Sequence, residues 1–569
     1  MSPSSSRPEP RVPAWHLFVP KLVSALREGY GLGDLRRDAL AGLTVAIVAL
    51  PLAMALAIAS GTTPDKGLIT AVVAGFLISA LGGSRVQIGG PTGAFVVVVF
   101  HVIQTHGYDG LVLATPMAGA LLVVAGLLRL GTWIKYVPEP VIVGFTAGIA
   151  VIIFSSQVKE LLGLELAAEP ADFLAKWQAF WQVRETLDPA TLALSLAALA
   201  LILALRRWAP RLPGFLVAVV LASLAALAFA LPVETIGTRF GGIPTTIALP
   251  PLPEVTLARL EALLPAAFTI AFLAGIESLL SAVIADGMTG RRHRSNCELV
   301  AQGVANAASA LVGGMPATGA IARTATNVRA GGRTPVAGML HAVFLLAFML
   351  LLAPLMRHVP LASLAAVLVV VAWNMSDLGR FRHLLRGPLG DRLVLLATFA
   401  LTVAVDITVA IEVGVVLAAI LFMHRMSEAV AIAGVPLIEP DRDDLARPAG
   451  ERRPDQRQDL PPGVEVFQLR GPLFFGVSTK FADVLGNIAR PPKVLVLRMR
   501  EVPMMDASGA GSLGDLLAQC RRRGTRVILS GLQPQPAAVL RRMHLLAADD
   551  PLLAEDLPAA LAEARRLLG

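Results

Sequence analysis

Two stretches of the sequence decide the fold: the first stretch, residues 85–95, reads RVQIGGPTGAF, and the second stretch, residues 315–329, reads MPATGAIARTATNVR. Each is an irregular, glycine-bearing lead into a hydrophobic segment, and each contains Thr-Gly-Ala, at 92–94 and at 318–320. A helix that begins inside a membrane points unpaired N–H groups and its positive dipole end at the space before it. Two such ends facing one another would form an anion site at the bilayer centre, where Arg323 would add a full positive charge. The alternative is a chance match between glycine- and alanine-rich segments, with glycines that serve helix packing.

The composition is that of a membrane protein. Of 569 residues, 55% are hydrophobic and 16% are charged, whereas a soluble protein of this length needs far more polar surface. Two cysteines, Cys297 and Cys520, exclude a disulfide framework and give no metal-ligand spacing. The net charge of +8 comes from arginines clustered between hydrophobic runs. That distribution is typical of a positive-inside membrane protein and does not indicate nucleic-acid binding.

The hydrophobic runs predict seven segments in each half of an all-α membrane region. The predicted spans are 40–59, 67–82, 92–104, 109–128, 138–156, 189–205, 213–232, then 263–285, 297–313, 318–329, 334–354, 361–376 and two within 393–423. The last run would be ~46 Å long as one helix, too long for a ~30 Å hydrocarbon core. Asp406 and Glu412 interrupt it, so we expect two helices with a turn. The third span of each half is short, as expected of an inverted repeat.

The arginines predict the orientation of the segments. If the N-terminus is inside, the basic residues fall in the inward loops, while the outward loops near 159–188 and 233–260 are mixed or acidic. Both termini are therefore expected in the cytoplasm.

We predict four parts along the chain. They are a cytoplasmic tail over 1–38, a transporter domain of 14 segments over 39–428, a charged, proline-rich linker over 429–461 and a soluble α/β domain over 462–569. In the last part we expect paired strands within 465–475, a buried strand at 494–499, another strand at 526–531 and helices at 479–488, 508–522, 535–546 and 556–568.

Glu277 is the only charged side chain within residues 263–285, ~6 Å from the middle of that segment. An ionised carboxylate is costly there, so its protonated form should become accessible near neutral pH. A protonatable acid beside a basic anion site suits proton coupling, because the proton removes a charge that repels the anion. The alternatives are a structural hydrogen bond across helices and a salt bridge to Arg323 that opens as the anion enters.

The expected anion-binding residues belong to the two Thr-Gly-Ala stretches and the turns that follow: Thr92, Gly93, Ala94, Phe95, Thr318, Gly319, Ala320, Arg323 and Thr324. The threonines would supply hydroxyl donors and Phe95 an apolar wall, although each is equally compatible with packing. We interpret Asp406 and Glu412 as capping or turn residues rather than transport residues.

Several separate segments carry a family resemblance. AGLTVAIVALPLAMALAIASG, GGSRVQIGGPTGAFVVVV, AGIESLLSAVIADGMTG, TGAIARTATNVRAGGRTPVAG and VVVAWNMSD resemble the sulfate permease (SulP) family, also called solute carrier family 26. VPMMDASGAGSLGDLL resembles the family's STAS domain, which is shared with anti-sigma factor antagonists. The resemblance covers about residues 35–569.

The resemblance implies fourteen membrane segments in two inverted repeats of seven, with a core domain from segments one to four and eight to eleven and a gate domain from the others. It implies a homodimer in the cell (inner) membrane that carries sulfate, bicarbonate, chloride, nitrate, oxalate or dicarboxylates. Many sulfate-carrying members have glutamine after the first-helix proline, where this chain has Leu52. PLAMALAIASG and IESLLSAVIADGMTG look most like bacterial importers of C4 dicarboxylates with protons. In the family, the glutamate that matches Glu277 is linked to proton coupling.

In the STAS-like domain, residues 506–509 match the loop where the antagonists bear a phosphorylated serine, which points to Ser508. Alternatively, Asp506 or Ser508 simply caps the following helix.

The sequence thus predicts a secondary active anion transporter whose partners are a small anion, protons, the bilayer and cytoplasmic proteins that bind the STAS-like domain. The alternatives are an uncoupled channel or uniporter, against which Glu277 argues, and a membrane anchor that recruits partners. The sequence has no nucleophile–base constellation, metal cluster or Walker-type GxxxxGK[ST]. We therefore expect no enzymatic activity, no cofactor and no ATP-driven transport.

Overall fold

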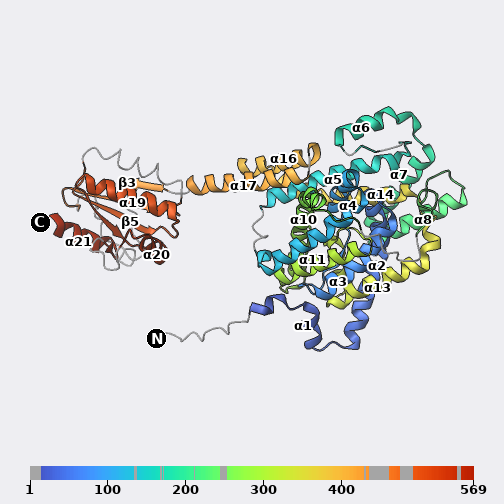
Figure 1. Cartoon of the computed structure of the whole chain (residues 1–569), viewed down its shortest axis with the longest axis horizontal. Helices are drawn as coiled ribbons and strands as arrows, with labels where there is room; N and C mark the ends of the chain where they lie inside the picture. Colours follow the sequence, from blue (N-terminus) through green and yellow to red (C-terminus); the bar gives the residue numbers. More distant parts are fainter. Residues whose placement is uncertain are drawn as a thin grey trace. The chain divides into compact units, whose positions relative to one another are not determined.

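The computed structural model describes residues 14–132, 138–166, 169–170, 172–210, 212–243, 253–405, 407–428, 431–434, 460–474, 491–546 and 553–568. The chain divides into two compact units, Met1–Ala418 and Ala419–Gly569. In Figure 1 the first runs from blue to orange and the second from orange to red.

In its described residues, the first unit consists of helices, the loops between them and two strands of two residues each. Its first half contains η1 (Ala14–Phe18), α1 (Lys21–Arg27), α2 (Leu32–Ala59), α3 (Pro64–Leu81), β1 (Gly89–Gly90), α4 (Gly93–Leu127), η2 (Leu130–Thr132), α5 (Glu139–Leu162), α6 (Phe173–Gln182), η4 (Arg184–Thr186), α7 (Pro189–Trp208), α8 (Gly214–Ala228) and α9 (Ile236–Phe240). Its second half contains α10 (Leu257–Thr289), α11 (Ser295–Leu311), β2 (Thr318–Gly319), α12 (Ile321–Arg329), α13 (Pro335–Met356), α14 (Leu361–Met375), α15 (Leu378–Leu384), α16 (Leu389–Ala404) and α17 (Ile407–Glu428), which continues into the second unit.

The predicted breaks in the hydrophobic runs are present. Gly107 (φ 72°, ψ 176°) interrupts α4 between the predicted third and fourth spans, and φ in this range suits glycine. The predicted turn in the last run separates α16 from α17. Within the described ranges, nine helices are long and apolar enough to cross a membrane. The mostly helical fold is confirmed, and the count of fourteen segments stays a prediction.

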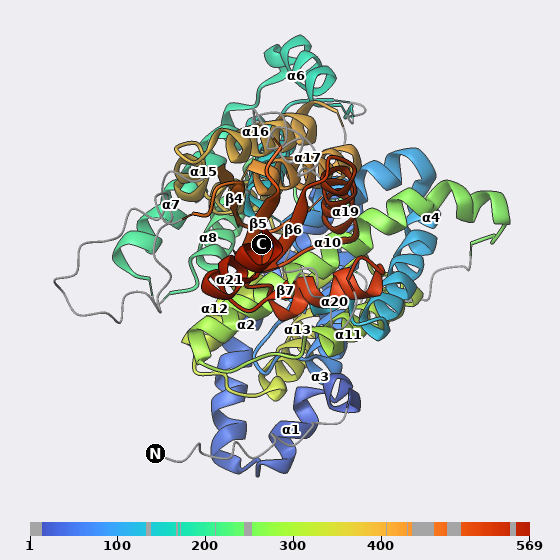
Figure 2. The same cartoon turned by 90° about the vertical axis from the view of Figure 1, so that its left-hand side faces the viewer.

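The helices pack in two groups. In the first group, α13 packs against α2 and α3, and α4 packs against α10 and α11. Since α2 and α3 are the first two spans of the first half and α10 and α11 are the first two of the second half, equivalent helices of the two halves make equivalent contacts. In Figure 2, α3, α11 and α13 of this group lie side by side. In the second group, α5 packs against α7, α14 and α16, and α7 packs against α8. These groups correspond to the expected core and gate domains.

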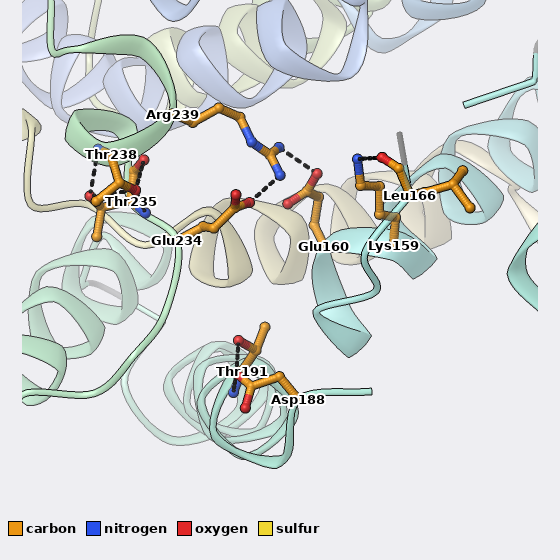
Figure 3. A network of polar contacts seen from close by, with 9 residues as sticks. All are labelled: Lys159, Glu160, Leu166, Asp188, Thr191, Glu234, Thr235, Thr238 and Arg239. Carbon is orange, nitrogen blue, oxygen red and sulfur yellow. Dashed lines mark hydrogen bonds and ion pairs between the residues drawn. The ribbon is translucent and has the colours of Figure 1, made fainter. Parts of the chain in front are cut away.

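Polar contacts fix the ends of the second group of helices (Figure 3). Arg239 of α9 pairs with Glu160 of α5 at 2.6 Å and also with Glu234. The Asp188 carboxylate accepts hydrogen bonds from the backbone N–H groups of Ala190 and Thr191, which caps α7. The network lies in the two loop regions that the sequence predicts to face outward.

The second unit is a five-stranded sheet covered by helices on both faces. Its described elements are β3 (Ala431–Gly434), β4 (Val464–Arg470), β5 (Val494–Glu501), α19 (Ala507–Arg522), β6 (Arg526–Ser530), α20 (Pro534–Arg542), β7 (Leu553–Ala554) and α21 (Leu557–Leu568). The strand order is β3-β4-β5-β6-β7, antiparallel for β3–β4 and parallel for the rest. One apolar cluster joins the sheet to α19 and α20, and another joins it to α21.

Most of the predicted elements of this unit are present, and two short strands, β3 and β7, are additional. Residues 431–434 lie within the predicted linker, yet all four pair with β4. The helix predicted at 479–488 lies outside the described residues. The domain boundaries stay predictions.

Candidate anion site

The two Thr-Gly-Ala stretches meet in the middle of the first unit. β1 and β2 pair antiparallel, with Gly89 opposite Gly319 and Gly90 opposite Thr318. The backbone N–H of Ala320 also donates to the carbonyl of Ile88, at 2.8 Å. Segments that are far apart in the sequence are thus joined at the points where α4 and α12 begin, as the sequence predicts.

Both helices start without a side-chain cap. The residue before α4 is Thr92 and the residue before α12 is Ala320, and neither side chain accepts a bond from the first turn. Uncapped first turns leave N–H donors and a positive dipole end available. A Cβ on Gly93 would lie 2.5 Å from Met375 Sδ and 3.3 Å from Ile153 Cδ1. The start of α4 therefore contacts α14 and α5, helices of the second group.

Arg323 lies buried beneath the first stretch, with 2% of its surface exposed. Its Nη2 donates to the carbonyl oxygen of Pro91 at 3.0 Å, while Nε and Nη1 have no hydrogen-bond partner within the described chain. A Cβ on Gly90 (φ 147°) would lie 2.2 Å from Nη1, so a side chain at this position would displace the guanidinium and strain the backbone. The charge of Arg323 thus lies directly behind Pro91 and Thr92, the two residues before α4.

Glu277 of α10 contacts the first stretch from the other side. Its Oε2 accepts a hydrogen bond from Thr92 Oγ1 at 2.8 Å, and both side chains are half-buried. The alternative ion pair with Arg323 does not form in this structure, since the described residues contain no acid within 4.0 Å of that guanidinium. The site therefore holds an acid and a base that do not neutralise one another directly.

The other predicted site residues are buried and differ in what they contact. Thr318 Oγ1 donates to the carbonyl of Ala274 at 2.8 Å. Thr324 Oγ1 accepts from the Ile88 N–H and from Ser281 Oγ, both at 3.1 Å. These two hydroxyls hold the two stretches in place. Buried at the same two stretches are Ala94, Phe95, Gly319 and Ala320.

A buried polar network that sequence reasoning missed holds the chain before β1. The Glu298 carboxylate of α11 is fully buried and accepts from the N–H groups of Gly83 and Ser84 at 2.8 and 3.2 Å. It also accepts from Ser278 Oγ at 3.0 Å and Gln302 Nε2 at 2.9 Å. Gln87 Nε2 donates to the same Ser278 Oγ at 2.7 Å. Ser278, next to Glu277, is thereby tied to the segment that leads into β1.

The same face of α11 also holds the chain before β2. Asn306 donates to the carbonyl and accepts from the N–H of Ala317, both at 2.8 Å. Ser309 Oγ donates to the carbonyl of Met315 at 2.8 Å. The signal in the sequence is the spacing of Glu298, Gln302 and Asn306 by four residues, which places all three on one face of a helix.

Four predicted residues remain, and the three that the structure describes lie outside the two stretches. Glu412 is exposed on α17, and Asp406 lies outside the described residues. In the second unit, Asp506 Oδ1 accepts from the Gly509 N–H at 2.7 Å, so Asp506 caps α19. Ser508 is exposed in the first turn of that helix.

The geometry defines a class: a membrane protein whose two halves each contribute an uncapped helix start to one central site, joined to a small α/β domain. The sulfate permease family model matches residues 35–398, and the STAS domain model matches residues 459–553. The chain belongs to the sulfate permease family.

Relatives along most of the chain are named as transporters. The protein named "Putative sulfate transporter YvdB" of Bacillus subtilis is 42% identical over 521 residues, which is 91% of this chain and 95% of that protein. The Bicarbonate transporter BicA of Synechocystis is 31% identical over 523 residues, 90% of this chain and 91% of that protein.

Solved structures give the same fold. The transmembrane domain of a cyanobacterial bicarbonate transporter BicA is 31% identical, has a TM-score of 0.60, and the match covers 68% of this chain and 98% of that one. The murine Solute Carrier 26 family member A9 anion transporter in the inward-facing state has a TM-score of 0.84 at 17% identity, with 99% of this chain and 97% of that one covered. The second likeness concerns the fold alone.

Proposed function

We propose that the chain is a secondary active anion transporter, a proton-coupled symporter for a C4 dicarboxylate or a related anion bound between the first turns of α4 and α12. The observation that carries the proposal is the buried guanidinium of Arg323, which has two unpartnered nitrogens and no acid within ion-pair distance among the described residues. A buried cation without a counter-ion is costly. An anion before two helix starts would supply that counter-charge. The similarity to proteins named sulfate and bicarbonate transporters supports the anion class.

The proposed roles of the residues follow from what each contacts. The first-turn N–H groups of α4, at Gly93 and Ala94, and those of α12, which follow Ala320, would donate to the anion. The Ala320 N–H already donates to the Ile88 carbonyl, so Ala320 would position the start of α12. The half-buried Thr92 hydroxyl donates to Glu277 Oε2 in this structure. Once Glu277 is protonated, the same hydroxyl can accept from the acid and donate to the anion. Arg323 would act as a charge behind the first stretch rather than as a surface contact.

Thr318 and Thr324 have a supporting role in this proposal. Their hydroxyls already bond to the protein, so they would hold the two helix starts in place rather than donate to the anion.

Glu277 is the proposed coupling residue. Its carboxylate bonds to Thr92, one residue before α4, so a charge on it stands next to the place proposed for the anion. An ionised Glu277 opposes the anion by like-charge repulsion, and a protonated one does not. Proton binding and anion binding would therefore favour one another, which is the thermodynamic requirement for symport.

We also propose how the chain is placed in the cell. The arginine distribution supports a multi-pass protein of the inner membrane with both termini in the cytoplasm. The family resemblance supports a homodimer and a STAS domain that binds cytoplasmic partners.

The test is transport into proteoliposomes of the purified chain, with labelled succinate, bicarbonate and sulfate, each with and without an inward proton gradient. Proton-coupled dicarboxylate symport predicts succinate accumulation that rises as external pH falls. Accumulation of bicarbonate or sulfate instead would favour the second candidate, a bicarbonate or sulfate transporter, which the similarity to BicA supports. Flux of any of them that only equalises concentrations would contradict coupling and favour a channel or uniporter.

Glu277→Gln separates binding from coupling, because glutamine keeps the shape and hydrogen bonding of a protonated glutamate but cannot titrate. We expect this variant to exchange labelled for unlabelled anion while losing proton-driven accumulation. Accumulation with native pH dependence in Glu277→Gln would remove the coupling role and make Asp406 the next acid to test.

A further inference from the structure

His341 is a buried imidazole to which the site described above gives no role. It lies on α13 with no exposed surface, and neither ring nitrogen has a hydrogen-bond partner in the described part of the chain. A buried polar group without a partner is destabilising, because it has lost its hydrogen bonds to water. Natural proteins rarely leave such groups unmatched, so a fully buried histidine with two of them points to a bound group.

The packing of α13 places this imidazole near the first stretch. A Cβ on Gly42 of α2 would lie 3.0 Å from the backbone nitrogen of His341. Gly338, three residues earlier, approaches Ser79 of α3 and Ile88, the residue before β1, since a Cβ there would lie 2.0 Å from Ser79 Oγ and 3.1 Å from Ile88 Cδ1. Residues three apart share a helix face. His341 thus lies about one turn along α13 from a residue that packs against Ile88, which immediately precedes β1.

Arg323 also has polar atoms without hydrogen-bond partners among the described residues. Its Nε and Nη1 are donors without acceptors in this part of the chain. A guanidinium only donates, whereas a neutral imidazole has one acceptor nitrogen and one donor. Two further side-chain acceptors of the two stretches have no partner in the described chain: Gln87 Oε1, two residues before β1, and Asn327 Oδ1, one turn after Arg323 on α12.

If His341 and Arg323 satisfy one another's hydrogen bonds, a third group must lie between the two side chains. No direct hydrogen bond joins His341 to Arg323 within the described residues. A water molecule needs two to four polar partners, and the two nitrogens of His341 with Nε and Nη1 of Arg323 would supply them. A resident anion fits less well, because it would cancel the charge that the transported anion requires.

We propose that His341 is a positioning residue for Arg323, and that the neutral imidazole and the guanidinium share ordered water that fixes the direction in which Arg323 presents its charge. The inference rests on the proposed anion site. It assigns anion affinity to a side chain on α13 that lies behind the site and does not touch the anion.

The test compares an apolar and a polar replacement in the full chain. His341→Leu removes both hydrogen-bonding atoms and should weaken the apparent affinity for succinate, bicarbonate or sulfate, whichever the native protein carries, by about tenfold, with a smaller change in maximal exchange rate. His341→Asn keeps an acceptor and a donor and should restore affinity to within about threefold. Ser195→Ala is the matched control, because Ser195 is also buried without a partner for its hydroxyl among the described residues but lies on α7. This control should bind as the native protein does.

A double-mutant cycle decides whether His341 acts through Arg323. In an Arg323→Ala background, His341→Leu should cause no more than about a twofold further loss, because coupled residues are not additive. Additive losses, or native affinity in His341→Leu, would overturn the inference. Native affinity in Arg323→Ala would instead overturn the proposed anion site, so the two failures are distinguishable.

A density map of the full chain in lipid provides a readout that does not depend on the variants folding. Ordered solvent density between the His341 ring and the Arg323 guanidinium would support the inference. Continuous protein density that joins the two side chains directly, or a dry apolar gap, would overturn it.

Discussion

Asn306→Ala should destabilise the first unit, because it removes the side chain that holds the chain before β2. Asn306 is fully buried and satisfies both the N–H and the carbonyl of Ala317, the residue before β2. Removal of the amide leaves two buried backbone groups without partners, at about 1–3 kcal/mol each. The expected loss is therefore about 2–6 kcal/mol, with the lower end reached if water enters the space.

Asn296→Ala is the matched control, because Asn296 is a buried asparagine of the same helix whose Oδ1 has no partner among the described residues. Thermal unfolding of the purified chain, followed with and without anion, should show a much lower midpoint and a smaller anion-induced rise for Asn306→Ala than for Asn296→Ala. Equal midpoints in the two variants would refute the argument that Asn306 holds the second stretch.

Three further changes have distinct expected outcomes. Gly319→Ala should weaken anion binding, because its Cβ would lie 1.5 Å from Gln87 Nε2, whereas Gly287→Ala on α10, with open space around it, should not. Asp506→Ala should lower the stability of the STAS domain by about 1 kcal/mol through loss of the α19 cap, while exposed Ser508→Ala should stay within about 0.5 kcal/mol, and denaturant unfolding measures both. A soluble fragment over 429–569 should be more stable than one over 462–569, because only the longer one contains β3, and equal stability would show that β3 pairing contributes nothing.

The fold was largely predictable because a bilayer limits what a chain can do. Apolar length, arginine distribution and a short third span in each half indicate an inverted repeat, and the breaks at Gly107 and between α16 and α17 follow from segment length. The strand at 431–434 was not predictable, because the four residues Ala-Ile-Ala-Gly after a long helix are too few to show a strand pattern and form a strand only by pairing with β4.

The two segments that form the site could be predicted from the sequence, but the buried side chains that hold those segments in place could not. The repeated Thr-Gly-Ala correctly indicated that two distant helix starts meet, because each half uses the same kind of glycine-bearing segment to lead into its short helix. Whether a threonine hydroxyl faces the proposed anion, as Thr92 could, or the protein, as Thr324 does, depends on neighbours such as Ser281 that sequence position alone does not reveal. Glu298 was missed because it lies in a predicted span with other polar residues and does not stand alone as Glu277 does.

One measurement tests the central claim most directly: the anion affinity of Arg323→Ala against that of Arg380→Ala, for the anion that the native protein transports. Arg323 is buried behind the first stretch, whereas Arg380 is exposed on α15, where it approaches Glu139 and Asp377 at 3.8 and 3.7 Å. We expect affinity to fall at least about tenfold in Arg323→Ala, as for loss of a charge in a buried site, and to be nearly unchanged in Arg380→Ala. Equal effects of the two substitutions would contradict a central anion site between α4 and α12.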